Sequence, residues 1–91
     1  MKINALIADP SDSVVTLTAA VRKGDTVAYY CGADVLSLTA KQDIPVYHKI
    51  AVRPVEKGRP VLKYGETIGI ARCGISPGEH VHTHNLSSDG R

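Results

Sequence analysis

Apolar residues recur along this chain in a frame of seven positions, with an apolar residue at each end and a glycine in the middle. The frame occurs five times, centred on Gly24, Gly32, Gly58, Gly65 and Gly78. Glycine adopts positive φ without steric cost, so a glycine flanked symmetrically by apolar residues indicates a turn between two strands. Five such corners in 91 residues predict a small all-β fold of short, bent strands, with at most one short helical turn, which the pattern allows over 16–21.

The corner at 76–79 carries the most specific turn chemistry. Its Ser-Pro-Gly-Glu sequence places proline second and glycine third in a four-residue turn. A type II turn requires positive φ at its third position and favours proline at its second. We therefore predict a type II turn immediately before the histidine-rich segment.

Apolar runs between the corners predict the strands, which we place at 2–8, 14–18, 35–40, 60–64 and 67–71. The strand at 14–18 is supported by the similarity of 14–27 to 48–61, because both stretches pass from an apolar run into a Lys-Gly corner. Leu36 and Leu38 alternate with polar neighbours and are expected to face inward. We predict a single domain over 1–91, with a polar tail at 86–91 that frays.

Composition narrows the class of protein. Phe and Trp are absent, so Val, Ile, Leu and Tyr must fill a modest core. The net charge is +2 and no Lys/Arg run interleaves with aromatic residues, which argues against a nucleic-acid binder. No apolar run approaches the ~20 residues of a membrane span, and the first apolar run is too short for a signal peptide. We expect a cytoplasmic protein, in which Cys31 and Cys73 form no CxxC motif and are ordinary thiols.

Three of the four histidines lie in the segment 80–85, at alternate positions. In an extended strand these side chains, His80, His82 and His84, would all point to one side. Such a row is either the solvent face of a strand or a functional edge, and the hexapeptide alone does not separate the two. The basic surroundings favour function, because 48–84 holds all four histidines and six Lys or Arg residues but only three Glu. A cationic, imidazole-rich region suits small anions such as carboxylates.

The histidines could bind a metal only as an open site. Same-face residues of a strand lie ~6.6 Å apart, so two imidazoles could bend towards one ion but three could not. No thiolate or carboxylate is spaced to close the site, which would need ligands from another chain. The alternative role is that of a proton or hydrogen-bond donor to a substrate oxygen.

Three segments, 48–51, 63–69 and 78–85, together resemble the small SAF-type domain of the altronate dehydratase/D-galactarate dehydratase family. The resemblance extends from Asp12 to Asn85, and the pattern G-E-x-V-H-x-H-N is met in full. In that family the domain is either the N-terminal part of a long enzyme or a separate small subunit. The family also includes the small subunit of sulfolactate sulfo-lyase.

The resemblance implies a β-clip fold, dependence on Fe²⁺ or Mn²⁺, and elimination of water from a sugar acid. The larger polypeptide would provide most of the metal ligands, so this chain would be a hydro-lyase subunit that is inactive alone. Without its partner the chain could form a homo-oligomer. It would complete the active site with His82 and His84 as catalytic residues, which are also candidate metal ligands completed by the partner. The expected substrate-binding residues are His48, Lys49, Lys63 and Asn85.

Two departures from the family pattern affect the substrate more than the fold. Ser13 stands where many dehydratases carry Asn, and Tyr47 stands where glycine commonly precedes His-Lys. The alternatives are therefore a small subunit of (2R)-sulfolactate sulfo-lyase, which is a carbon–sulfur lyase, and a non-catalytic SAF-type module for ligand binding or assembly. The combination of His48-Lys49 with the histidines of 82–85 argues against the second alternative, which would not need it.

Overall fold

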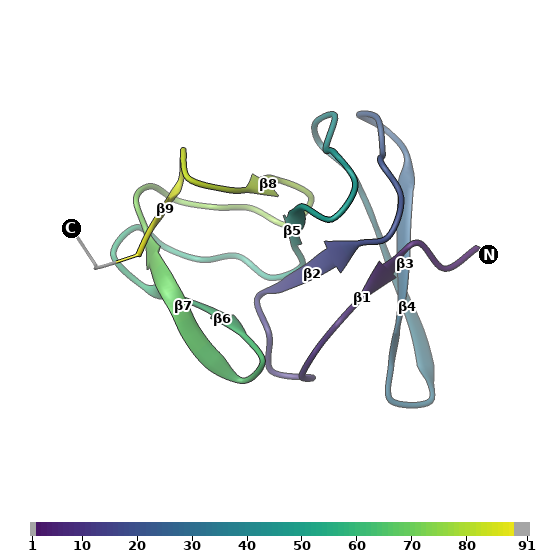
Figure 1. Ribbon diagram of the computed structural model, residues 1–91, viewed down its shortest axis with the longest axis horizontal. Helices are drawn as coiled ribbons and strands as arrows, with labels where there is room; N and C mark the ends of the chain where they lie inside the picture. The colour runs from purple at the N-terminus through teal and green to yellow at the C-terminus, as the bar shows by residue number, and fades with distance from the viewer. Residues whose placement is uncertain (1, 89–91) are drawn as a thin grey trace.

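The computed structural model describes residues 2–88, and in that range it consists of strands and turns without a helix (Figure 1). In chain order the strands are β1 (Ala5–Leu6), β2 (Val14–Leu17), β3 (Thr26–Cys31), β4 (Asp34–Thr39), β5 (Lys49–Ala51), β6 (Pro60–Lys63), β7 (Glu66–Ala71), β8 (His80–Val81) and β9 (Leu86–Ser87). The all-β prediction is confirmed. The helical turn considered over 16–21 does not form. No helix that could cross a membrane occurs in the part of the chain that the structure describes.

The strands form three antiparallel sheets, with the orders β1-β2-β5-β8, β3-β4 and β6-β7-β9. The four-stranded sheet lies in the middle, with the β3–β4 hairpin on one side and β6-β7-β9 on the other (Figure 1). Side chains alternate along β2, so Val15 and Leu17 enter one core while Val14 enters the other. The central sheet is therefore buried on both faces by two small cores made of Val, Ile, Leu, Ala and one Tyr.

The chain contains an internal repeat, which we define as a first repeat over 17–48 and a second over 51–79. Val21 and Ile44 exchange two backbone hydrogen bonds in the first repeat (3.0 and 2.9 Å). Val55 and Ile75 make the same pair in the second (2.9 and 2.8 Å). Three further hydrogen bonds of the first repeat have an equivalent in the second. The bond from Gly24 N to Ala40 O corresponds to that from Gly58 N to Ala71 O. In the same way, Leu17 N to His48 O corresponds to Ala51 N to Glu79 O, and Tyr47 N to Leu17 O corresponds to Gly78 N to Ala51 O. The similarity of 14–27 to 48–61 is thus the visible part of a full structural repeat.

All five predicted corners have the expected backbone. The central glycines have φ between 63° and 95°. At 76–79, Glu79 N donates to Ser76 O (3.1 Å) and Gly78 has φ 95°, which is the type II turn that the sequence predicted.

Several strand boundaries and orientations differ from the predictions. Only Ala5–Leu6 of the apolar run at 2–8 is a strand. Leu38 packs against the first core, but Leu36 is 44% exposed, because the β3–β4 hairpin extends past the core that should cover it. The polar tail is also partly ordered. Leu86 packs against the second core and pairs with Ala71 as part of β9, so the predicted fraying at 86–91 is wrong for 86–87, while 89–91 lie outside the described residues.

The segment before β2 fixes the turn between β6 and β7. Asp12 is fully buried, and its carboxylate accepts hydrogen bonds from the backbone N–H groups of Tyr64 (3.0 Å), Gly65 (2.9 Å) and Asp9 (3.0 Å). A buried carboxylate requires such partners. Ser13 adds a second tie, since its Oγ accepts from Leu62 N (3.1 Å). Ser13, a departure from the family pattern, therefore has a structural role.

Candidate functional site

The structure gathers all four histidines at one place. His48 enters β5, His80 begins β8, and the two strands pair with His80 opposite Ile50. The His48 ring stacks on that of His82 with 4.6 Å between centroids and lies 5.1 Å from that of His80. The His80 ring is also 5.6 Å from that of His82 and 5.3 Å from that of His84. We call these four side chains the imidazole cluster.

The histidine-rich segment is not the straight strand that its alternation predicted. β8 ends at Val81, and a turn follows, in which Asn85 N and Leu86 N both donate to His82 O (3.1 and 2.9 Å). The turn folds the chain back, so the three rings do not form a straight row. Instead, the His80 ring lies close to the rings of both His82 and His84. The alternation rule fails here because a side chain, not a strand partner, determines the local backbone.

That side chain is Asn85. Its Oδ1 accepts from His82 N (2.9 Å), and its Nδ2 donates to His80 O (2.8 Å). Asn85 is only 4% exposed, so its amide is used inside the protein. This geometry gives Asn85 a positioning role, in which it holds the histidine turn. Its predicted role in substrate binding stays a prediction.

A direct hydrogen bond links two members of the cluster. His48 Nδ1 lies 2.9 Å from His80 Nε2, so one of these nitrogens donates and the other accepts. Burial and, next, the neighbouring charges of His48, His84 and His82 lower the pKa of His80 to about 4. His80 is therefore neutral near pH 7, and it connects the other rings without adding a positive charge.

A basic hollow of about 270 Å³ adjoins the cluster at His82. Its described lining consists of Lys49, Arg72, His82, Thr83, Leu86 and Ser88. None of these described residues is acidic, and two carry hydroxyl groups. A small anion with hydroxyl groups matches this lining, because cationic side chains attract the charge and Ser and Thr can hydrogen bond to hydroxyls.

Arg72 was not singled out from the sequence, although it lines this hollow with Lys49. It directly follows β7, and its backbone N–H donates to Asn85 O (2.9 Å). The pairing of β7 with β9 thus brings Arg72 beside the histidine turn. No local sequence signal marks that pairing, since β9 has only two residues.

Lys63 lies apart from the imidazole cluster. Its Nζ is 4.8 Å from the centroid of the Tyr64 ring, and it lines a separate hollow of about 380 Å³ with Leu6 and Thr16. Thr16 is directly opposite Lys49 in the β2–β5 pair, so the two hollows open on the same face of the central sheet. The Thr16 Oγ1 is buried and has no hydrogen-bond partner among the described residues.

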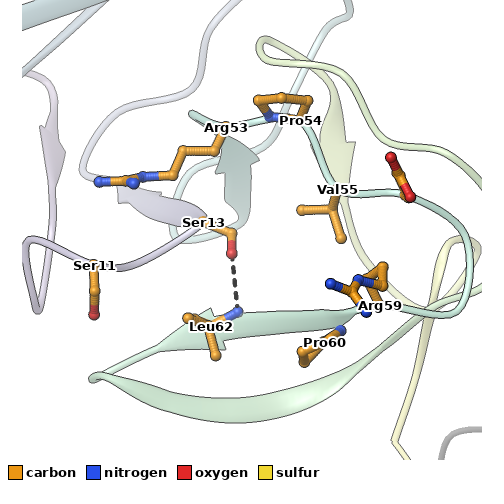
Figure 2. Close-up of a pocket in the computed structure, with 9 residues that line it drawn as sticks. Ser11, Ser13, Arg53, Pro54, Val55, Arg59, Pro60 and Leu62 are labelled. Atoms are coloured by element: carbon orange, nitrogen blue, oxygen red, sulfur yellow. Dashed lines mark hydrogen bonds between the residues drawn. The ribbon is translucent and has the colours of Figure 1, made fainter.

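A third hollow, of about 430 Å³, is not part of this site (Figure 2). Arg53, Arg59 and Leu62 help to line it, and none of the four histidines does. One Arg53 nitrogen, Nη2, donates to Pro10 O (2.8 Å). Ser13 and Leu62, which also line this hollow, are joined by the hydrogen bond from Leu62 N to Ser13 Oγ (Figure 2). The candidate functional site therefore consists of the imidazole cluster and the basic hollow beside it.

The cluster does not form a metal site by itself. Among the residues that the structure describes, no group of three or more His, Cys, Asp or Glu side chains is arranged to hold an ion. The facing nitrogens of His48 and His80 are hydrogen-bonded to each other, and the rings of His82 and His84 both contact that of His80. The open metal site with His82 and His84 therefore stays a prediction that depends on ligands from another chain.

Comparisons with known proteins agree with the resemblance seen in the sequence. Residues 3–89 match the family described as the altronate/galactarate dehydratase SAF domain. Altronate dehydratase of Escherichia coli (strain K12) is 38% identical over 98% of this chain, which corresponds to 16% of that enzyme. The (2R)-sulfolactate sulfo-lyase subunit alpha of Chromohalobacter salexigens is 33% identical over 97% of both chains. The subunit alpha of Paracoccus pantotrophus is 50% identical over 56% of this chain and 76% of its own. The chain thus spans about one-sixth of the length of the altronate dehydratase and nearly all of one sulfo-lyase subunit.

Proposed function

Because the chain belongs to the altronate/galactarate dehydratase SAF domain family, we propose that it is the small component of a sugar-acid dehydratase and completes the active site of a larger polypeptide. The observation that carries this proposal is the imidazole cluster beside a basic hollow without described acidic residues. The cluster supplies proton-transfer groups, and the hollow supplies charge for an anionic substrate.

The substrate carboxylate binds in the basic hollow. Lys49 and Arg72 provide the positive charge, and Thr83 and Ser88 contact the hydroxyl groups of the sugar acid. The hollow, at about 270 Å³, is small for a drug-sized ligand and suits an acid of a few carbons. Lys63, on the same face of the sheet, binds the far end of a longer acid.

His82 and His84 are the catalytic residues, and they have different roles. Dehydration removes a proton from the carbon next to the carboxylate, and a base of the larger polypeptide accepts it. A C–O bond breaks at the adjacent carbon, and the departing hydroxide takes a proton to leave as water. His82 is exposed, lines the hollow and stacks on His48, so it protonates the leaving hydroxyl. His84, also exposed, orients the substrate. His80 and Asn85 position these rings.

The metal expected from the family does not fit the described residues of this chain alone. We therefore assign Fe²⁺ or Mn²⁺ to the larger polypeptide, where the ion would supply positive charge that stabilises the deprotonated substrate. No step assigned to His82 or His84 depends on that ion.

A sulfo-lyase subunit is the second candidate. It is favoured by the match to the C. salexigens subunit alpha, which extends over 97% of both chains. The chemistry at the hollow would be the same removal of a proton, with sulfite leaving instead of hydroxide. The basic lining accommodates a sulfonate as well as a carboxylate.

Turnover by the assembled enzyme tests the proposal. We would coexpress the chain with a large lyase polypeptide from the same genome and assay altronate, galactarate and sulfolactate for loss of water or sulfite. We expect His82→Gln to lower kcat by about 100-fold or more, while Lys57→Gln, at an exposed position outside the site, retains most activity. Turnover that does not need the small chain, or that survives His82→Gln, would contradict the proposal. A stable complex that is inactive on all three acids would instead support a non-catalytic module.

A further inference from the structure

We propose that the outer part of the β3–β4 hairpin is the surface by which this chain binds its larger lyase polypeptide. The hairpin lies at one flank of the molecule, and its turn points away from the central sheet (Figure 1). We call its apolar outer part, with Tyr30, Val35 and Leu36, the hairpin arm. The inference rests on the proposed function, because it names a surface for the partner which that function requires.

The hairpin arm exposes apolar side chains on both of its faces. Tyr30 is 60% exposed and Val35 47%, and they lie directly opposite each other in the β3–β4 pair, which places them on one face. Leu36 is opposite Tyr29 and therefore points to the other face, where it is 44% exposed. Single exposed apolar residues are common, but a contiguous group indicates an interaction surface.

The backbone edge of β4 is also open. β4 pairs only with β3 in its sheet, and within residues 2–88 no segment forms a ladder on its other edge. On that side the corner at Gly78 packs against Thr39 at the end of the strand, and Lys41 N donates to Gly78 O (2.8 Å) just beyond it. Open strand edges readily accept an added strand, and proteins normally protect them.

The internal repeat shows a difference between the two hairpins. β9 pairs with the last two residues of the equivalent strand β7, Ile70 and Ala71, whereas within residues 2–88 no strand pairs with this edge of β4. Counted from the equivalent Ala40 and Ala71, the positions of Val35 and Leu36 correspond to Glu66 and Thr67. The second hairpin thus has a paired strand at its base and polar residues at these two positions, and the first hairpin has neither. Tyr64, in the turn of the second hairpin, is also exposed.

The relatives indicate what occupies the hairpin arm. The same domain makes up 16% of the E. coli altronate dehydratase and almost the whole of the C. salexigens subunit alpha. A domain that occurs both fused and separate needs one surface that faces the rest of the enzyme in either case. An added strand from that larger polypeptide would pair with β4, and Tyr30 would serve as its aromatic anchor.

The hairpin arm is also connected to the candidate site. β4 ends at Thr39, and Gln42, three residues later, accepts a hydrogen bond through its Oε1 from the backbone N–H of His80 (2.8 Å). A partner that binds the hairpin is thereby linked to the element that carries the imidazole cluster. Binding at the hairpin arm can therefore place the rest of an active site against the histidines.

A double variant tests the inference. Val35→Glu with Leu36→Thr replaces the two residues by those at the equivalent positions of the second repeat. Both residues are exposed, so the fold should persist, which circular dichroism and thermal denaturation would verify. We expect the variant to bind the coexpressed large polypeptide about 30-fold or more weakly by calorimetry. Val46→Thr, which makes an exposed apolar residue outside the hairpin arm polar, should bind as the wild type does.

The outcomes separate this inference from the proposed function. At saturating concentration the double variant should recover wild-type kcat, whereas His82→Gln should bind normally and lack turnover. A complex that forms through the hairpin arm but acts on no hydroxy acid would contradict only the proposed function. Wild-type affinity in the double variant, or no binding by the wild-type chain, would overturn the inference. So would a wild-type homodimer that the double variant disrupts without a change in affinity for the large polypeptide.

Discussion

Tyr47 and Gly78 occupy the same place in the two repeats, and both have positive φ, at 67° and 95°. Each N–H donates to the equivalent carbonyl oxygen, that of Leu17 in the first repeat (2.9 Å) and that of Ala51 in the second (2.8 Å). The hydrogen bond thus fixes a left-handed backbone at this position in both repeats. A tyrosine can occupy the first repeat because its side chain projects into solvent, where it is 75% exposed.

The second repeat cannot accept a side chain at this position. A Cβ on Gly78 would collide with the carbonyl oxygen of Thr39 and press on the side chain of Lys41 at 3.1 Å. The first repeat packs against the corner of the second there, whereas the equivalent corner at Tyr47 has open surroundings. The comparison shows that the same backbone conformation can accept or exclude a side chain, depending on which residues pack beside it.

Gly78→Ala should cause the largest effect in this comparison. The left-handed conformation costs an alanine about 1–2 kcal/mol, and the collision with Thr39 adds about 1–3 kcal/mol. We expect the free energy of unfolding, from urea denaturation followed by circular dichroism, to fall by about 3 kcal/mol. Gly24→Ala is the matched control, because Gly24 has φ 94° and a Cβ there would meet nothing within 4 Å beyond its chain neighbours. Equal losses in the two variants would show that the collision is unimportant.

The residue at the start of the strand after each of these corners makes a smaller difference between the repeats, in how stability depends on pH. The residue equivalent to Lys49 in the second repeat is His80, whose pKa is lowered to about 4 by burial and by the other imidazoles. The unfolded chain binds a proton at His80 below about pH 6.5, which the folded chain does not bind until about pH 4. The contribution of His80 to the free energy of unfolding is therefore complete above pH 6.5, and it is lost as the pH falls towards 4.

The measurable loss should be on the order of 1 kcal/mol, since the half-exposed ring is screened by solvent. Urea denaturation at intervals between pH 4 and 7 would measure it, with His80→Gln as the comparison that removes this one titration. NMR titration of the His80 ring gives its pKa directly. A ring that titrates near pH 6.5, or an unchanged pH dependence in His80→Gln, would contradict the assignment.

Local chemistry made the corners predictable, and contacts between distant segments explain what was missed. A glycine that needs positive φ can be recognised from its own neighbours, as at Gly58. Whether Leu36 meets the core depends on how far the hairpin extends past the central sheet, which alternation does not encode. The turn after Val81 depends on the amide of Asn85, and β9 is too short to produce a pattern.

The candidate site shows the same division. The sequence predicted that His48 would lie beside the 80–85 segment, and the rings of His48 and His82 are stacked. It also grouped Lys63 with them, although Lys63 lines a neighbouring hollow, because Asp12 fixes the β6–β7 turn elsewhere on that face. The functional roles of these residues stay predictions.

Tyr47→Gly should have the smallest effect and gives the sharpest view of the comparison. Glycine relieves about 1–2 kcal/mol of left-handed strain, but it also increases the conformational freedom of the unfolded chain by about 0.5–1 kcal/mol. Little packing is lost, because the tyrosine side chain is exposed. We expect a gain of about 0.5 kcal/mol in the free energy of unfolding, measured by the same urea denaturation. A loss of more than about 1 kcal/mol would mean that the Tyr47 side chain stabilises the corner through contacts. The two repeats would then differ in how this turn is stabilised, because the first would depend on a side chain and the second on the absence of one.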